Sequence, residues 1–364
     1  MTSKAYANDP LNPQASVLVD CQTDIKLIIK NGVLSGMSFF LIRDKVRKTI
    51  DKAISRIRSP TLKQAARLSL VNFANSAYAR FHAYFPDPTK AVAIYALTRS
   101  ITTKLADGKI DGTAKTYNPS SAIEKKAFKQ LYGVRDGYFK TPDMGVPLQE
   151  FQKEYIGKVK TALDDLAKQS ALDPNDVVGK NSLRNYAEMQ VRYERHQNEI
   201  NSLRESGVKL VVCSAHGDCS ERCSAFQGRV YSLDGTSGQT KDGKKYVPLE
   251  EATNPSDRKY YTKSGVPNAL FGYNCRHTIT PYKEGMLIPY VSKETQIKQR
   301  RITARQRELE RRVIQYREAA LMAKNTDKTA YKAARQKAIY WNKQYQEFSR
   351  VNGRAYYPDR VKIL

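Results

Sequence analysis

Cysteine, histidine and tryptophan are scarce in this chain of 364 residues, which contains five, four and one of them respectively. Long apolar runs are missing as well, since no window approaches the roughly eighteen consecutive apolar residues of a membrane-spanning helix. The first residues, MTSKAYANDPLNPQ, do not show the basic and then apolar pattern of a secretory signal. We therefore expect a protein that stays in the cytoplasm where it is made and has no membrane partner.

Acidic residues are also in the minority. Lys and Arg total 62 against 36 Asp and Glu, which gives a net charge of +26. Such an excess favours a polyanionic partner, either nucleic acid or an acidic protein surface. The charge is concentrated near one end, because residues 291–364 hold nineteen Lys and Arg but only seven Asp and Glu, a net charge of +12.

The remaining composition, with 40% hydrophobic and 10% aromatic residues, is that of a folded protein. The spacing of apolar residues predicts an α+β fold with a mainly helical N-terminal half, a small strand-and-turn central module and a C-terminal basic helical hairpin. We predict four parts: an extended N-terminal arm over 1–35, a helical domain over 36–180, an α+β module over 181–290 and the basic helical hairpin over 291–364. The arm is predicted because it contains Pro10 and Pro13 and shows no sustained period.

The central module is predicted from a long helix followed by short strands. Residues 181–207 have the pattern of one helix that ends at Gly207. Short β-type runs follow it: VKLVV, GRVYSL, KKYVPL and HTITPY. Between the second and third runs, GQTKDGKK approaches the phosphate-binding pattern but has Lys245 where Ser or Thr would bind magnesium. The Asp-Gly pair between two strand-like runs predicts a β-hairpin instead.

Three of the five cysteines and one of the four histidines lie within eleven positions of this module. Together with a second cluster they supply six potential zinc ligands: Cys213, His216, Cys219, Cys223, Cys275 and His277. Tetrahedral zinc needs four ligands and commonly takes them from two short clusters. In a reducing cytoplasm such clustering favours a metal or catalytic site over disulfides. The alternative is a small β-module in which the cysteines are buried free thiols.

Catalysis is not expected. His216 does not begin the H-x-E pattern of zinc deaminases, and no H-E-x-x-H is present. Cys275 and His277 would share a face of a strand as a thiol–imidazole pair, but the sequence shows neither an orienting third group nor an oxyanion-stabilising device. The chain is therefore not predicted to be an enzyme.

The C-terminal hairpin interleaves cations with aromatic rings. Its basic side chains would neutralise the phosphates of double-stranded DNA without reading the base sequence. The candidate DNA-binding residues are Arg300, Arg301, Arg305, Arg311, Arg312, Lys332, Arg335 and Lys337. The alternative is a hairpin whose rings pack internally and whose basic face is only solvated, and both descriptions can hold at once.

Two blocks of the module, VVCSAHGDCSERCSAFQGRVYSL and LFGYNCRHTITPY, carry a resemblance to a known family. The sequence resembles the central region of bacteriophage minor capsid proteins, the phage minor capsid protein 2 group related to Mu-F-like head morphogenesis proteins. The matching positions are Ser214, Ala215, His216, Gln227, Gly228, Asn274, Cys275, Arg276 and His277. The resemblance covers about residues 181–350.

The resemblance implies a structural minor capsid protein of a tailed bacteriophage, acting in head morphogenesis. Members lie inside the phage head near the portal, and some are delivered with the genome. The implied partners are the portal protein, the inner capsid shell or scaffold, and packaged double-stranded DNA; the implied location is the virion, after assembly in the host cytoplasm. We expect the helical domain to be the docking element. The alternatives are a phage-carried effector enzyme of the nuclease type and a nucleic-acid-binding zinc protein.

The resemblance also narrows the zinc ligands. Where relatives have a second histidine or a cysteine pair, this chain has Cys223. Alternation between His and Cys at one position is compatible with metal ligation. The implied ligands of Zn²⁺ are His216, Cys223, Cys275 and His277, with Cys219 as the alternate.

Overall fold

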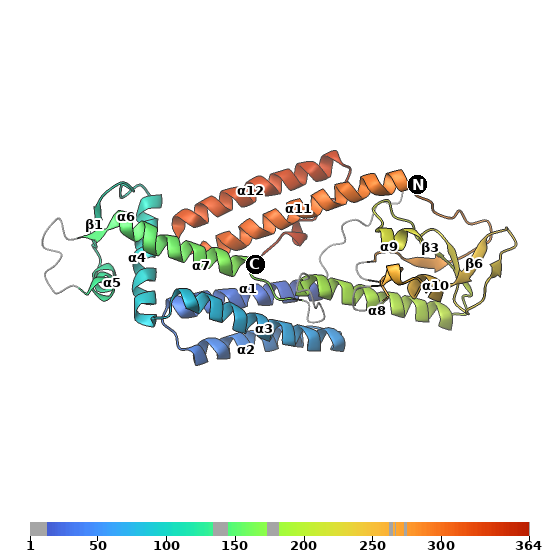
Figure 1. The fold of residues 1–364 in the computed structure, drawn as a ribbon, viewed down its shortest axis with the longest axis horizontal. Coiled ribbons are helices and arrows are strands. Elements are labelled where there is room, and N and C mark those ends of the chain that lie inside the picture. The colour runs from blue at the N-terminus through green and yellow to red at the C-terminus, as the bar shows by residue number, and fades with distance from the viewer. Residues whose placement is uncertain are drawn as a thin grey trace. The chain divides into compact units, whose positions relative to one another are not determined.

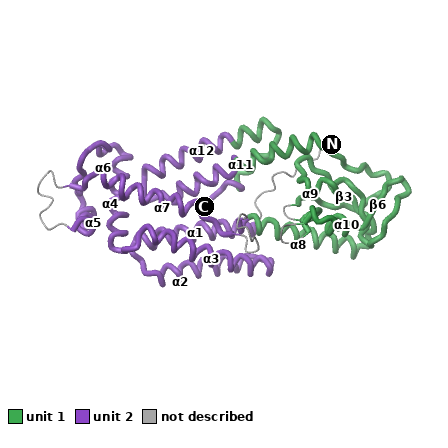
Figure 2. The backbone as a smooth tube through the Cα atoms, in the orientation of Figure 1, with its two compact units in different colours: residues 1–12, 185–308, 345–359 green, residues 13–184, 309–344, 360–364 purple. Residues whose placement is uncertain are grey.

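The computed structural model describes residues 13–133, 145–172, 182–261, 265, 267–272 and 275–363 (Figure 1). Helices dominate these residues and are accompanied by two small sheets, which confirms the predicted α+β class and its helical C-terminal hairpin. Within the described residues, no helix combines the length and the apolarity needed to cross a membrane. The chain folds into two compact units (Figure 2).

The larger unit comprises Pro13–Arg184, Leu309–Gln344 and Arg360–Leu364. Its elements in chain order are α1 (Pro13–Leu34), α2 (Phe39–Ser55), α3 (Pro60–Tyr84), α4 (Pro88–Ala106), β1 (Thr116–Tyr117), α5 (Ala122–Tyr132), β2 (Val146–Pro147), α6 (Leu148–Phe151), the π-helical η2 (Gln152–Ile156) and α7 (Gly157–Lys168). Parts of α11 (Lys293–Ala323) and α12 (Lys328–Val351) complete it, together with Arg360 at the end of the short η4 (Pro358–Arg360). The starts of α3 and α4 follow from sequence, since each has proline in its first turn and a capping side chain, Ser59 or Asp87.

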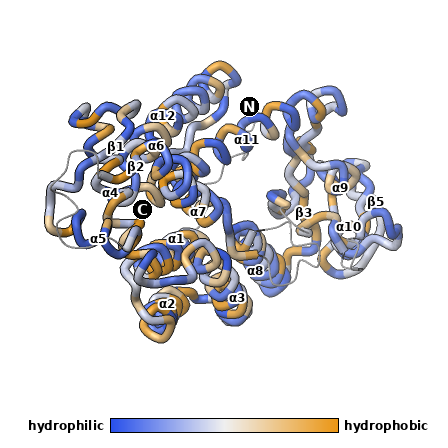
Figure 3. Tube along the Cα trace, turned by 60° about the vertical axis from the view of Figure 1, so that its left-hand side comes forward, coloured by the Kyte–Doolittle hydropathy of each residue, from blue (hydrophilic) through white to orange (hydrophobic). Residues whose placement is uncertain are grey.

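Helix α1 overturns the predicted extended arm. Residues 13–34 form a helix in which Ile25 and Ile29 are fully buried, and it packs against α2 and α3. Pro13 does not oppose this helix because it occupies the first turn, where a missing N–H costs nothing. Figure 3 shows apolar residues, in orange, recurring along α1. Residues 1–12 of the predicted arm lie outside the described residues.

Two lysines of α1 are buried among these apolar residues. The ammonium of Lys26 donates a 2.7 Å hydrogen bond to the carbonyl of Ala167 and lies 3.4 Å from a carboxylate oxygen of Glu318. Lys30 donates to the carbonyls of Met322 and Lys324, each at 3.2 Å. Burial lowers the pKa of Lys26, an effect that Glu318 opposes, and lowers the pKa of Lys30 to about 8. Both lysines therefore satisfy carbonyls near the ends of helices, which lack partners within the helix.

The smaller unit contains Asn185–Glu308 and Tyr345–Asp359. Its elements are α8 (Leu183–Glu205), β3 (Leu210–Cys213), α9 (Glu221–Ser224), β4 (Val230–Ser232), β5 (Gly238–Gln239), β6 (Lys245–Pro248), α10 (Leu249–Thr253), the 3-10 helix η3 (Arg258–Tyr260) and β7 (Ile279–Pro281), with the adjoining parts of α11 and α12. The sheet order is β5-β6-β4-β3-β7, in which β4 and β6 are parallel and the other pairs antiparallel.

The predicted Asp-Gly turn is confirmed, but the strands predicted to flank it are not its pair. The runs GRVYSL and KKYVPL contain β4 and β6, which pair in parallel, and the strand that pairs antiparallel with β6 is β5. Strands β5 and β6 pair with Gly238 opposite Tyr246. Gly243 turns the chain with a φ of +81°, which glycine adopts without steric cost. The carboxylate of Asp242 accepts hydrogen bonds from Tyr282 and from the backbone of Gly285, so this tip is fastened to the segment that follows β7.

The two C-terminal helices lie where the sequence predicts them, but their grouping differs. Asp327 caps α12 by accepting from the backbone N–H of Ala330. Residues 309–344 belong to the larger unit, whereas 291–308 and 345–359 belong to the smaller one. The structure thus groups the hairpin with both units instead of setting it apart as a domain over 291–364.

Candidate functional site

The site begins with the pairing of β3 and β7. Cys213 lies opposite Ile279 in this antiparallel pair, so the chain leaving β3 runs beside the chain entering β7. Ser214 continues the contact: its backbone N–H donates to Thr278 O, and its hydroxyl accepts from Thr278 N at 3.0 Å. The strand register therefore brings the two motif blocks together, although Ser214 and Thr278 are 64 residues apart in the sequence.

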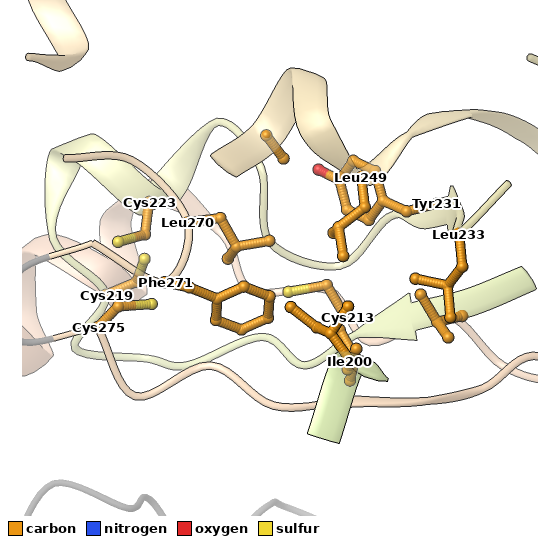
Figure 4. Close-up of a cluster of buried hydrophobic side chains, with 13 residues drawn as sticks. Ile200, Cys213, Cys219, Cys223, Tyr231, Leu233, Leu249, Leu270, Phe271 and Cys275 are labelled. Carbon is orange, nitrogen blue, oxygen red and sulfur yellow. The ribbon is translucent and has the colours of Figure 1, made fainter. Parts of the chain in front are cut away.

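A cluster of sulfur and imidazole lies where these two segments meet. The Sγ atoms of Cys219 and Cys223 and a ring nitrogen of His277 all lie within 4.8 Å of one another. The Sγ of Cys275 lies 3.3 Å from Nδ1 of His277. Figure 4 shows Cys219, Cys223 and Cys275 together at one end of the hydrophobic core of the smaller unit, with Cys213 apart from them. All of these side chains are buried.

The three thiols do not ionise independently. Hydrogen bonds from Cys219 and Cys275 lower the pKa of Cys223. The hydrogen bond to Cys223, together with burial, raises the pKa of Cys219, and the same two causes raise the pKa of Cys275.

Gln227 is a residue of this candidate site whose contacts residue types and spacing in the sequence do not reveal. Its Oε1 accepts a 2.9 Å hydrogen bond from the backbone N–H of His216, which identifies that atom as the amide oxygen. The same oxygen lies 3.0 Å from Nε2 of His277. Since an amide oxygen only accepts, Nε2 of His277 carries the proton and Nδ1 presents its lone pair to the sulfurs. Only the family resemblance singled out Gln227, because it lies fifty residues from His277.

Cys275, His277 and Gln227 together have the order of a thiol, a base and an orienting amide. Gln227 is therefore the orienting third group that the sequence alone did not reveal for the pair of Cys275 and His277. Cys275 is only 4% exposed, however, and its pKa is raised, so its sulfur is neither accessible nor ionised as a nucleophile must be. The arrangement is better suited to holding a cation than to attacking a substrate.

His216 lies beside the cluster but faces other partners. Its Nε2 is 3.1 Å from the hydroxyl of Ser214 and 3.2 Å from the carbonyl of Arg276, which only accepts. Its ring centroid lies 4.5 Å from that of His277. Burial, together with the nearby His277, lowers the pKa of His216 to about 4. Of the predicted quartet, the structure brings Cys223, Cys275 and His277 together and adds the alternate ligand, Cys219.

Two further motif positions have structural explanations. Gly228 has a φ of +61°, and a Cβ added there would lie 2.1 Å from the carbonyl oxygen of Pro289. Only glycine allows this approach of one backbone to another. Ala215 is buried next to it, whereas Arg276 is half-buried. Asn274 lies outside the described residues.

The candidate DNA-binding side chains are distributed along α11 and α12. Six of them are exposed and two, Arg300 and Arg312, are half-buried; the exposed ones are Arg301, Arg305, Arg311, Lys332, Arg335 and Lys337. Some contact neighbours: Arg300 pairs with Glu221 at 3.0 Å, and Lys332 donates to Ala106 O at 2.8 Å. Cations and rings also meet directly, since Arg312 lies over the ring of Trp341 at 4.3 Å.

The aromatic residues of the hairpin follow both descriptions given by the sequence. Tyr345 is fully buried and its ring contacts Tyr356, as internal packing predicts. Tyr340 is 55% exposed, as a stacking surface requires. Figure 3 shows hydrophilic and apolar residues mixed along α11. Both helices combine buried apolar residues, such as Val313 and Ala338, with exposed cations, as amphipathic helices do.

Comparison with known proteins gives one match. The family model for phage minor capsid protein 2 covers residues 160–349, more than half of the chain. No curated protein and no solved structure matches. The family match supports a structural role in a bacteriophage. The chain belongs to the phage minor capsid protein 2 family, which confirms the resemblance noted in its sequence.

Proposed function

We propose that this protein is a non-catalytic structural component inside the head of a tailed phage, near the portal, where it contacts packaged double-stranded DNA. One observation carries the proposal: a member of a capsid family presents exposed cations along both C-terminal helices. The net charge of +26 supports it, since packaged DNA is the dominant polyanion in a phage head. No base-reading motif accompanies the cations, so the contact is to phosphates and independent of sequence.

The DNA contact is tested with point substitutions, because α11 and α12 belong to both units and truncation would remove part of each. The triple variant Arg311→Gln, Arg335→Gln and Lys337→Gln should bind unrelated duplexes more weakly than the unaltered chain. For every phosphate that the variant no longer neutralises, the log–log slope of affinity against salt should also become shallower by about 0.9. Fluorescence anisotropy titrations at several salt concentrations measure both quantities.

A matched control removes the same charge elsewhere. Arg43, Arg80 and Lys126 are exposed on α2, α3 and α5, and their triple substitution by Gln lowers the net charge equally. The control should bind with nearly unchanged affinity. An equal weakening in the two triple variants would show that total charge, and not the C-terminal helices, determines binding.

Docking to the portal or inner shell is assigned to the helical residues of 36–180. Large apolar side chains remain exposed at the start of α2, where Phe40 is 78% and Leu41 is 56% exposed. An apolar surface of this kind supports a protein contact. The double variant Phe40→Ser and Leu41→Ser, in the full chain, should no longer co-purify with co-expressed portal protein. Ile123→Ser is the control, since Ile123 is 72% exposed but lies on α5. Undiminished recovery of the double variant would refute this assignment.

A further inference from the structure

The buried sulfur and imidazole cluster has the donor set and spacing of a zinc site. Zinc prefers thiolate and imidazole ligands, at about 2.3 Å for sulfur and about 2.0 Å for nitrogen. Ligand atoms around a tetrahedral ion of this size lie about 3.5–3.8 Å apart. The ligand atoms of Cys219, Cys223 and His277 lie within 4.8 Å of one another, so they are already close to this spacing. The Sγ of Cys275 lies 3.3 Å from Nδ1 of His277 but is not in that group of three, so its side chain must move to complete the tetrahedron.

The imidazole is already oriented for a metal. Gln227 holds the Nε2–H of His277, so Nδ1 carries the lone pair and faces the sulfurs. Metal-binding histidines usually donate their second ring N–H to such a partner, which fixes the tautomer. Because Oε1 of Gln227 is in turn held by the backbone N–H of His216, one amide fastens the histidine to the chain that follows β3.

We infer that this module binds one structural zinc ion through the Sγ atoms of Cys219, Cys223 and Cys275 and through Nδ1 of His277, with Gln227 as the positioning residue. The inference is independent of the proposed DNA and portal contacts. It replaces His216, implied by the family resemblance, with Cys219. Binding exchanges the three thiol protons, which pass to solvent, for one Zn²⁺ held by three thiolates.

His216 is left out of the ligand set because the ligand atoms that lie within 4.8 Å of one another belong to Cys219, Cys223 and His277. The Nε2 of His216 contacts the ends of β3 and β7 instead. The carbonyl of Arg276 accepts from that nitrogen, and the hydroxyl of Ser214 lies on the same atom. These contacts link the chain that follows β3 to the chain that precedes β7 without involving the metal. His216 and Cys219 are therefore assigned different tasks that an experiment can separate.

Metal content of the full chain tests the assignment. Protein purified without chelators should contain about one zinc per chain by plasma emission. Cys219→Ser and Cys223→Ser should lose it, whereas His216→Ala should retain it. Cys213→Ala is the matched control, because Cys213 is an equally buried cysteine of the same core outside the sulfur cluster. Zinc that is absent from His216→Ala but retained by Cys219→Ser would overturn the assignment.

A second measurement uses only the unaltered chain, in case the serine variants do not fold. A mercurial thiol reagent should release one zinc ion per chain to a chromogenic chelator, in step with the modification of three metal-bound thiols. Cobalt exchanged for zinc should show the sulfur-to-metal charge transfer of three thiolates. A chain that contains no zinc, or one with a Cys219–Cys223 disulfide by mass spectrometry, would contradict the inference.

The positioning role of Gln227 has its own readout. Gln227→Leu removes the acceptor for His277 and should weaken zinc affinity by about 10–100-fold, the usual effect of removing such a partner. Gln227→Glu keeps an acceptor oxygen at the same place and should restore most of the affinity. If both variants lose affinity equally, Gln227 has only a packing role. Competition with a chelator of known affinity measures the two constants.

Discussion

Gly228→Ala should destabilise the smaller unit by about 3 kcal/mol or more. A left-handed backbone costs a residue with a Cβ about 1–2 kcal/mol. The added carbon would also lie 2.1 Å from the carbonyl oxygen of Pro289, a distance that only a backbone shift can relieve. That shift would move the chain between Gln227 and β4, and with it the amide that holds His277. Urea unfolding of the full chain, followed by circular dichroism, measures the change in stability.

Gly235 supplies the control for this substitution. It has a φ of +79° in the same unit, but a Cβ there would meet nothing within 4 Å. Gly235→Ala should therefore cost only the left-handed conformation, about 1–2 kcal/mol. The difference between the two variants isolates the contact with Pro289. If the two variants are destabilised equally, the close approach of Gly228 to the backbone of Pro289 does not contribute to the loss of stability.

Lys26→Ala should destabilise the larger unit by about 3–5 kcal/mol, the usual cost of breaking a buried ion pair from one side. The Lys26 side chain is 1% exposed and that of Glu318 16% exposed, so the remaining carboxylate would lie largely out of water. The carbonyl of Ala167 would lose its donor as well. Denaturant unfolding with a probe of helix content gives the change.

Lys48→Ala is the corresponding surface change. Lys48 pairs with Asp44 at 2.7 Å, but its side chain is 72% exposed. Removing it should cost less than about 1 kcal/mol, since exposed ion pairs contribute little. Replacing both buried partners, as Lys26→Met with Glu318→Leu, should recover much of the stability, because no unpaired charge then remains. A double variant as unstable as Lys26→Ala would argue against this explanation.

Much of the fold follows from local patterns in the sequence. The stripe of Ile42, Val46 and Ile50 predicts α2, and the Asp-Gly pair predicts the turn before β6, although not β5 as the strand that enters it. Helix α1 does not follow in this way, because Lys26 and Lys30 occupy buried positions of its helical face and break the apolar stripe. Charged side chains at such positions are tolerated only through contacts with distant elements, which no local window contains.

The site is predictable in composition but not in geometry. Clustering of cysteine and histidine identifies the residues, yet the choice between His216 and Cys219 depends on which atoms face the cluster. That orientation is set by the β3–β7 register and by Gln227, both of them long-range contacts. The apolar periodicity of the sequence likewise does not predict that α11 and α12 are divided between the two units, since each is one continuous helix.

The pairing of β3 with β7 also has a consequence for the order in which the protein is made. The strands close a loop that runs from Cys213 to Ile279, and closing a chain of this length costs about 4 kcal/mol of entropy. A ribosome synthesises Cys219 and Cys223 well before Cys275 and His277. Until β7 has been synthesised and pairs with β3, the thiols of Cys219 and Cys223 are not yet enclosed by the hydrophobic core of the smaller unit. The nascent chain therefore passes through an interval in which these cysteines are open to oxidants and to free metal ions.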